Sequence, residues 1–270
     1  MRASVNRNAF TIAFATLCGL AWLALWLWGR SAYSQALHHD HLAAADGTGT
    51  GFLALFLAGW TVMTAAMMLP TSLPLINMFY AMIRYKVDRS RLIALLIAGY
   101  LAVWLLFGVV ALLGDTAFHA AVGRSAWLRA NDWVIFPAVL ALAGVYQFSP
   151  LKYYCLEKCR SPLSFVMGHW RGGNERLQSL RLGLHHGLFC VGCCWSLMLL
   201  MFAVGAGHIG WMLALGAVMV AEKNMPWGRR ISRPLGLALL AWALGAAILA
   251  PVWAAPGAGI DQVIRWVCHT

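Results

Sequence analysis

Long apolar stretches separated by short polar connections are the dominant pattern along this chain. A helix needs about 20 apolar residues to cross a bilayer. The pattern predicts seven such helices, at residues 9–29, 52–80, 92–113, 133–149, 186–206, 208–222 and 235–254. We therefore predict an all-α integral membrane protein, a helical bundle of about seven transmembrane helices that forms a single membrane domain over residues 1–270.

Three of these segments have features of their own. The second contains Pro70 and Pro74, which predict a kink, with the freed carbonyls bonded by neighbouring helices. The sixth is short, so the fifth and sixth form either two spans or a re-entrant hairpin. The first follows Arg2 and Arg7 and resembles a signal peptide, but its length and its tryptophans favour a transmembrane helix.

Basic residues gather in alternate connections between the apolar segments. Loops rich in Lys and Arg stay in the cytoplasm, so the pattern places the N-terminus inside and the C-terminus outside. The longest connection, 150–185, is then a basic cytoplasmic loop. Part of it, Ser161 to Trp170, is expected to form a short helix on the membrane surface.

Composition supports the membrane class and excludes others. The 270 residues are 61% hydrophobic and only 11% charged, whereas about a quarter of a soluble domain is charged. The net charge of +11 does not indicate nucleic acid, because the basic residues lie between apolar segments. There is no P-loop, and "GAGHIG" at 205–210 lacks the strand that a dinucleotide site requires. A lipid bilayer is therefore the expected environment.

Soft metal ligands are concentrated in the segment "LHHGLFCVGCCWSLMLLMF", 184–202. At 100° per residue, Cys190 lies about 40° from His186 and Cys193 about 20° on the other side. These three side chains form one stripe, while Cys194 points about 100° away from Cys193. Thiolate ligands favour Cu(I) or zinc over magnesium or calcium. Small cysteines packed between helices are the alternative.

"CLEKC" in the cytoplasmic connection holds a second pair of thiols. Cys155 and Cys159 are spaced i,i+4, so they share a face if the segment is helical. The spacing is not the C-x-x-C of a zinc knuckle or a thioredoxin-like site. Both metal ligation and unligated thiols remain open.

The third group is the methionine run of the second segment. Met63 and Met67 are spaced i,i+4, with Met68 beside them. Met67 and Met68 should lie level with about Met198 and Met201, because the second and fifth segments cross in opposite directions. Thioethers near the middle of the membrane would then receive a soft ion from thiols near the inside. Packing of methionine in the core is the alternative.

The first outer loop contains "HHDH", in which imidazoles and a carboxylate suit Cu(II) or Zn(II). We name His38, His39 and His41 as candidate ligands, with Asp40 beside them. His208 could continue a metal path at the outer face. The remaining Cys18, Cys268 and His269 look incidental.

Three stretches of the sequence resemble a bacterial family of predicted metal-binding integral membrane proteins that are copper-chaperone-like. They are "WTVMTAAMMLPTSLP", "YQFSPLKYYCLEKCRSPLSF" and "GLHHGLFCVGCCWSLML", within about 50–225. The resemblance implies copper as the favoured metal. It points to the motif positions Met63, Met67, Met68, Cys155, Cys159, His186, Cys190, Cys193 and Cys194. The "HHDH" loop falls outside the matched stretches.

The sequence thus favours a protein that binds Cu(I) and handles, moves or delivers it, with a cuproenzyme as an expected partner. Zinc is the second choice of metal. One alternative is a structural or assembly subunit of a larger membrane complex, since small residues allow close helix contacts. Another is a thiol-redox or metalloenzyme, which lacks support because no acid–base pair is evident.

Overall fold

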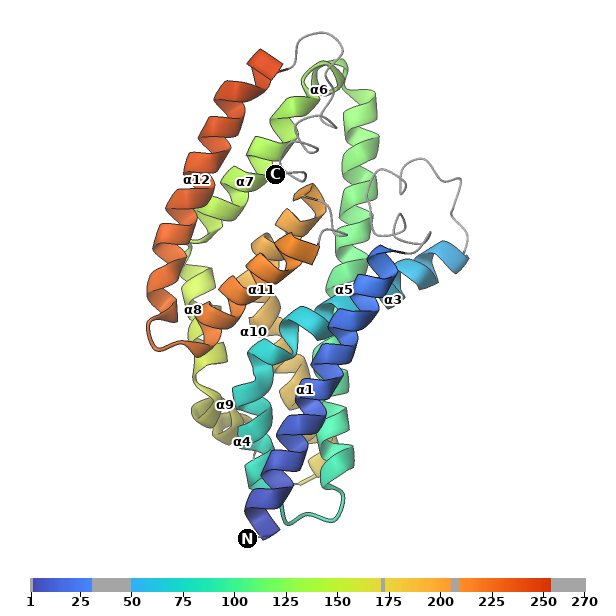
Figure 1. The fold of residues 1–270 in the computed structure, drawn as a ribbon, viewed down its shortest axis with the longest axis vertical. Helices are drawn as coiled ribbons and strands as arrows, with labels where there is room; N and C mark the ends of the chain where they lie inside the picture. The colour runs from blue at the N-terminus through green and yellow to red at the C-terminus, as the bar shows by residue number, and fades with distance from the viewer. Residues whose placement is uncertain (1, 31–49, 171–172, 205–208, 254–270) are drawn as a thin grey trace.

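The structure is a computed structural model that describes residues 2–30, 50–170, 173–204 and 209–253 (Figure 1). Every regular element in these ranges is a helix, which confirms the all-α class. The helices are α1 Arg2–Gly29, α3 Thr50–Met68, η2 Pro70–Ser72, α4 Leu73–Ile83, α5 Arg89–Arg124, α6 Ala126–Ala130, η3 Asp132–Val134, α7 Ile135–Tyr146, α8 Pro150–Arg160, α9 Pro162–His169, α10 Glu175–Val204, α11 Ile209–Asn224 and α12 Gly228–Trp253.

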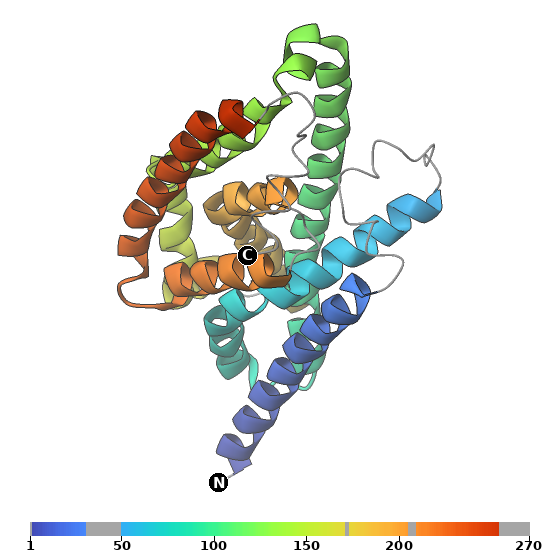
Figure 2. The same cartoon turned by 45° about the horizontal axis from the view of Figure 1, so that its top comes forward.

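Two helices, α10 and α11, occupy the middle of the bundle. In both views they lie between the α7–α12 pair on one side and the α1–α3 pair on the other, with α5 running along α10 (Figures 1 and 2). One continuous hydrophobic core joins these helices. Side chains of α10 that face α8, α5 and α11 are therefore removed from the surface.

Three helices in the described ranges are long and apolar enough to cross a membrane, namely α5, α10 and α12. The count rises to five if each of two bent helix pairs forms one span, the pairs being α3 with α4 and α7 with α8. All seven segments predicted from hydropathy contain a helix. The fold therefore has three to five candidate membrane spans, and seven stays a prediction.

The predicted kink in the second segment is present. Residues 53–83 bend by 41° where α3 ends and the short η2 helix begins at Pro70. The break frees the carbonyl of Met68, which accepts the hydroxyl of Thr71 at 2.7 Å and that of Tyr100 in α5 at 3.2 Å. A neighbouring helix thus satisfies the freed carbonyl, as expected for a broken apolar helix.

The connection between 150 and 185 is largely helical. Helix α8 begins at Pro150, where the Ser149 hydroxyl accepts the Lys152 amide at 3.1 Å, and it makes a 62° angle with α7. Helix α9 coincides with the helix predicted at Ser161–Trp170. Helix α10 already begins at Glu175, so the cysteines lie near its middle rather than near its start.

Glycines allow α5 and α10 to pack in close contact. A Cβ added at Gly99 of α5 would lie 2.5 Å from the carbonyl oxygen of Leu180 in α10. Gly183 of α10 in turn rests directly on the backbone of Leu96 in α5. This close crossing brings Tyr100 of α5 against the face of α10 that carries His186 and Cys190.

The exterior of the bundle is apolar. Leu106 of α5 and Leu244 of α12 are each 63% exposed, and many other large apolar side chains share this outward orientation. An apolar surface of this extent marks a protein that contacts lipid or another apolar partner. It agrees with the membrane environment expected from composition.

Candidate metal site

Four thiols come together inside the bundle, three from α10 and one from α8. Cys190, Cys193 and Cys194 are at most 1% exposed. The Cys193 thiol lies close enough to the thiols of Cys159, Cys190 and Cys194 to interact with all three. None of the four is in a disulfide. The fold therefore unites residues from two motifs that are about thirty positions apart in the sequence.

The backbone carbonyl of Cys190 orients two of these thiols. It accepts the Cys193 thiol at 3.1 Å and the Cys194 thiol at 2.8 Å. Cys194 was expected to diverge from Cys193 around the helix, yet its sulfur turns back to the same carbonyl. A thiol that donates carries its proton, so ligation of an ion requires both groups to lose a proton and turn.

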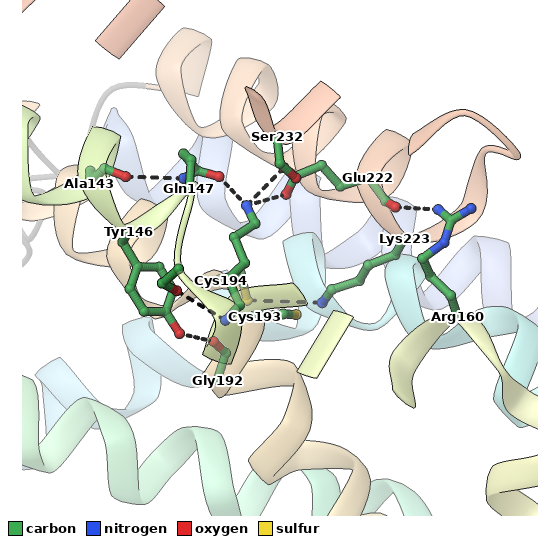
Figure 3. Close-up of polar contacts among 12 residues, drawn as sticks. Ala143, Tyr146, Gln147, Arg160, Gly192, Cys193, Cys194, Glu222, Lys223 and Ser232 are labelled. Atoms are coloured by element: carbon green, nitrogen blue, oxygen red, sulfur yellow. Dashed lines mark hydrogen bonds and ion pairs between the residues drawn. The ribbon is translucent and has the colours of Figure 1, made fainter. Parts of the chain in front are cut away.

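A lysine that the sequence analysis counted only toward topology lies within this cluster. The Lys223 ammonium, from the end of α11, is 2.9 Å from the Cys190 sulfur and 3.9 Å from the Cys194 sulfur. It also donates to the Thr71 hydroxyl at 3.2 Å. Figure 3 shows the Lys223 side chain extending to the cysteine sulfurs. Its residue is only 6% exposed.

The residue before this lysine anchors the end of α11. The Glu222 carboxylate accepts the Lys152 ammonium at 2.8 and 2.9 Å and the Ser232 hydroxyl at 2.7 Å. Lys152 also donates to the side chain of Gln147. Arg160 donates to the backbone carbonyl of Glu222 at 2.5 Å (Figure 3). Helices α8, α11 and α12 are thereby joined, which fixes the direction of the neighbouring lysine.

His186 lies one turn before Cys190 and has a defined hydrogen-bond arrangement. The Ser72 hydroxyl donates to the Met68 carbonyl at 3.3 Å, so it can accept the proton on His186 Nε2, 3.1 Å away. This tautomer leaves a lone pair on Nδ1, which is buried and has no hydrogen-bond partner among the described residues. Nδ1 is therefore the ring nitrogen through which this imidazole could bind a metal.

Tyr100 connects His186 with the thiols. Its ring stacks on the His186 ring with the centroids 5.5 Å apart. Its hydroxyl is 3.0 Å from the Cys190 sulfur. Because the phenol proton is directed at the Met68 carbonyl, the phenol oxygen can accept the proton of the Cys190 thiol. If Cys190 becomes a thiolate, the hydroxyl can turn to donate to that sulfur, beside the ammonium of Lys223.

Cys155 lies beside the cluster, on the face of α8 that contacts α10. A Cβ at Gly192 would be 2.6 Å from the Cys155 sulfur, so this thiol rests on the α10 backbone. Tyr146 donates its hydroxyl to the Gly192 carbonyl (Figure 3). Cys155 and Cys159 thus share a helix face, as their spacing predicted.

The candidate methionines are buried in the same core. Met63, Met67 and Met68 are at most 1% exposed. Met67 reaches α11, because a Cβ at Gly216 would lie 3.7 Å from its terminal methyl group. A continuous thioether path for an ion stays a prediction. Further buried methionines are Met198, Met201, Met212 and Met219.

No three His, Cys, Asp or Glu side chains within the described ranges are arranged to hold an ion as they stand. The hydrogen bonds explain this, because the thiols of Cys193 and Cys194 are directed at the Cys190 carbonyl. These thiols would have to turn away from the carbonyl before their sulfurs could bind one ion together. His38, His39, His41, His208, Cys268 and His269 lie outside the described residues.

The fold and the site together define a class: an all-helical protein with three to five candidate membrane spans and a candidate soft-metal site of buried thiols. The comparison of families then supplies the assignment: the chain belongs to the copper chaperone family PpoB2, which matches residues 57–246, well over half of the chain. This confirms the resemblance seen in the sequence and includes every residue of the thiol cluster. No curated protein and no solved structure matches the chain.

Proposed function

We propose that this protein binds Cu(I) at the thiol cluster inside a bacterial inner membrane and delivers it for the maturation of a cuproenzyme. The observation that carries the proposal is the convergence of Cys159, Cys190, Cys193 and Cys194 in a chain of a copper chaperone family. Thiolates are the ligands that Cu(I) prefers. Burial keeps competing hard ligands and water away from the ion.

The chemistry is exchange of ligands without a change of oxidation state. Cu(I) would bind two of the sulfurs as each bound thiol releases its proton. The lone pair on His186 Nδ1 offers a nitrogen ligand one helical turn away. Because no nucleotide site is evident in the sequence, the affinity of successive soft ligands, including the buried methionines, would direct the ion.

The orientation follows from the basic connections. Seven spans with the N-terminus in the cytoplasm place the connection around Val87 and the α8–α9 region on the cytoplasmic side. The start of α10 then faces the cytoplasm, and α6 faces outward. Ions would approach the cluster from the reducing compartment, where thiols stay unoxidised.

Copper binding by the purified protein tests the proposal. The detergent-solubilised chain is loaded with Cu(I) under reducing conditions, and bound copper per chain is measured by mass spectrometry. About one ion or more should be retained, and the Cys190→Ser/Cys193→Ser double variant should lose it. Cys18→Ser is the matched control, because Cys18 lies in α1 away from the cluster.

Two results would contradict the proposal. Wild-type protein that retains no copper would make the cysteines packing residues and would favour a role as an assembly subunit. Equal copper in wild type and in the double variant would move the site away from α10. Size-exclusion profiles and helical circular dichroism of each variant verify that the fold is intact.

A further inference from the structure

The buried lysine of the cluster has no carboxylate partner in the described part of the chain. Its contacts are the sulfurs of Cys190 and Cys194 and the hydroxyl of Thr71. The nearby carboxylate of Glu222 is engaged by Lys152 and Ser232. The positive charge of Lys223 can therefore stabilise a thiolate that forms at Cys190 or Cys194.

A buried charge is costly unless an opposite charge is in contact with it. Deprotonation of Cys190 and Cys194 would supply two negative charges next to one fixed positive charge. A monovalent ion bound to both sulfurs brings the total to zero. A divalent ion bound in the same way leaves one uncompensated positive charge in a water-poor core.

We infer that Lys223 is a specificity-determining residue that makes the thiol site favour a monovalent soft ion over a divalent one. The inference rests on the proposed function and extends it from the ligands to the choice among metals. Thiolates alone do not discriminate in this way, since they bind Zn(II) as well as Cu(I). The fixed ammonium supplies the missing discrimination through charge.

The position of the lysine is well determined, which such a role requires. Glu222 is held by contacts to α8 and α12, and Arg160 binds its carbonyl. The Thr71 hydroxyl, on the short helix after the Pro70 break, accepts a hydrogen bond from the ammonium. The charge thus stays within contact of the sulfurs and is not free to turn to solvent, because the residue is buried.

The test compares metal preference in the full-length, detergent-solubilised protein. Cu(I) affinity is measured by competition with a chromophoric Cu(I) chelator, and Zn(II) affinity with a chromophoric zinc chelator. Lys223→Met removes the charge and keeps the chain length, and Lys223→Gln removes it with a polar end in case the first variant does not fold. Lys223→Arg keeps the charge, and Lys158→Met is a control at an exposed lysine of α8.

Wild type should prefer Cu(I). The neutral variants should shift the Cu(I)-to-Zn(II) affinity ratio toward zinc by on the order of 1,000-fold, as expected for one unit charge near 4 Å at an effective dielectric constant of about 20. Lys223→Arg and Lys158→Met should stay close to wild type. A ratio within about threefold of wild type in both neutral variants, with Cu(I) still bound, overturns the inference alone. Failure of wild type to bind Cu(I) overturns the proposed function and the inference with it.

Discussion

Cys190 is the residue at which the contacts of the site converge. Its sulfur meets the ammonium of Lys223 and the hydroxyl of Tyr100, and its carbonyl accepts two further thiols. The ammonium, and the phenol once its hydroxyl has turned, can both donate to a thiolate that forms at this sulfur when an ion binds. Under the proposed function, Cys190 is therefore the expected first ligand of an incoming ion.

Tyr100→Phe tests the contribution of the phenol to that sulfur. The variant keeps the ring against His186 and removes the hydroxyl that lies 3.0 Å from Cys190. Loss of one hydrogen bond to a thiolate should weaken Cu(I) binding by about tenfold, measured by chelator competition. Tyr154→Phe, at an exposed tyrosine of α8, should leave the affinity unchanged. Equal affinities for both variants would show that Tyr100 only packs.

Residue spacing predicted the cysteines and His186, but it did not predict their neighbours. Helical periodicity shows which residues of one segment share a face. It carries no information about a lysine 33 positions away, and Lys223 has the same signature in the sequence as a basic residue of a cytoplasmic loop. The only local indication in the sequence that Lys223 is buried is its proximity to Glu222 at the end of an apolar segment. This indication is weak.

At the scale of elements, close contact between α5 and α10 sets the position of the site. Gly99 meets the Leu180 carbonyl, and one residue later Tyr100 meets Cys190 and His186. A larger separation of the two helices would withdraw the phenol from the sulfur. Gly99 and Tyr100 thus belong to the same contact between α5 and α10.

Gly99→Ala should therefore destabilise the protein, whereas Gly114→Ala in the same helix should not. The added methyl group at Gly99 meets backbone atoms 2.5 Å and 3.1 Å away, while nothing lies within 4 Å at Gly114. Overpacking at Gly99 should cost about 1–3 kcal/mol, and Gly114→Ala should be neutral or stabilise by up to about 1 kcal/mol. Reversible denaturation in detergent measures both. Equal stability of the two variants would contradict the close crossing.

Hydropathy predicted where helices occur, and prolines predicted the break at Pro70. It did not predict where α10 begins, because charged and polar residues alternate with the leucines of the first turns, from Glu175 to His185, and lower the mean hydropathy there. The basic residues of α8 were assigned to a loop for the same reason. Lys152 is in fact fully buried, since its charge is matched by Glu222, a partner 70 positions away in the sequence.

At the scale of the whole molecule, the thiols come from helices that are separated in the sequence. The orientation of the protein in the membrane decides which compartment these thiols face. The proposed orientation places Val87 inside and Trp127 outside. Both are well exposed, at 99% and 61%. They are therefore suitable sites for a reporter of sidedness.

Cysteines introduced as Val87→Cys and Trp127→Cys should react differently with a membrane-impermeant thiol reagent. In intact spheroplasts only the Trp127→Cys chain should gain the mass of the label, and Val87→Cys should react after permeabilisation. The parent chain is the control, because most native thiols of the described residues are buried. The opposite pattern would reverse the proposed orientation.

The cluster is completed late in the synthesis of the chain. Synthesis runs from the N-terminus, so α8 and α10, with all four thiols, are made before α11. A nascent chain that ends before residue 222 contains the Lys152 ammonium without its carboxylate and Cys190 without its cation. Glu222 and Lys223, two consecutive residues, supply both missing charges when they are added. Helix α11 thus completes these two buried contacts, which can form only once it has been translated.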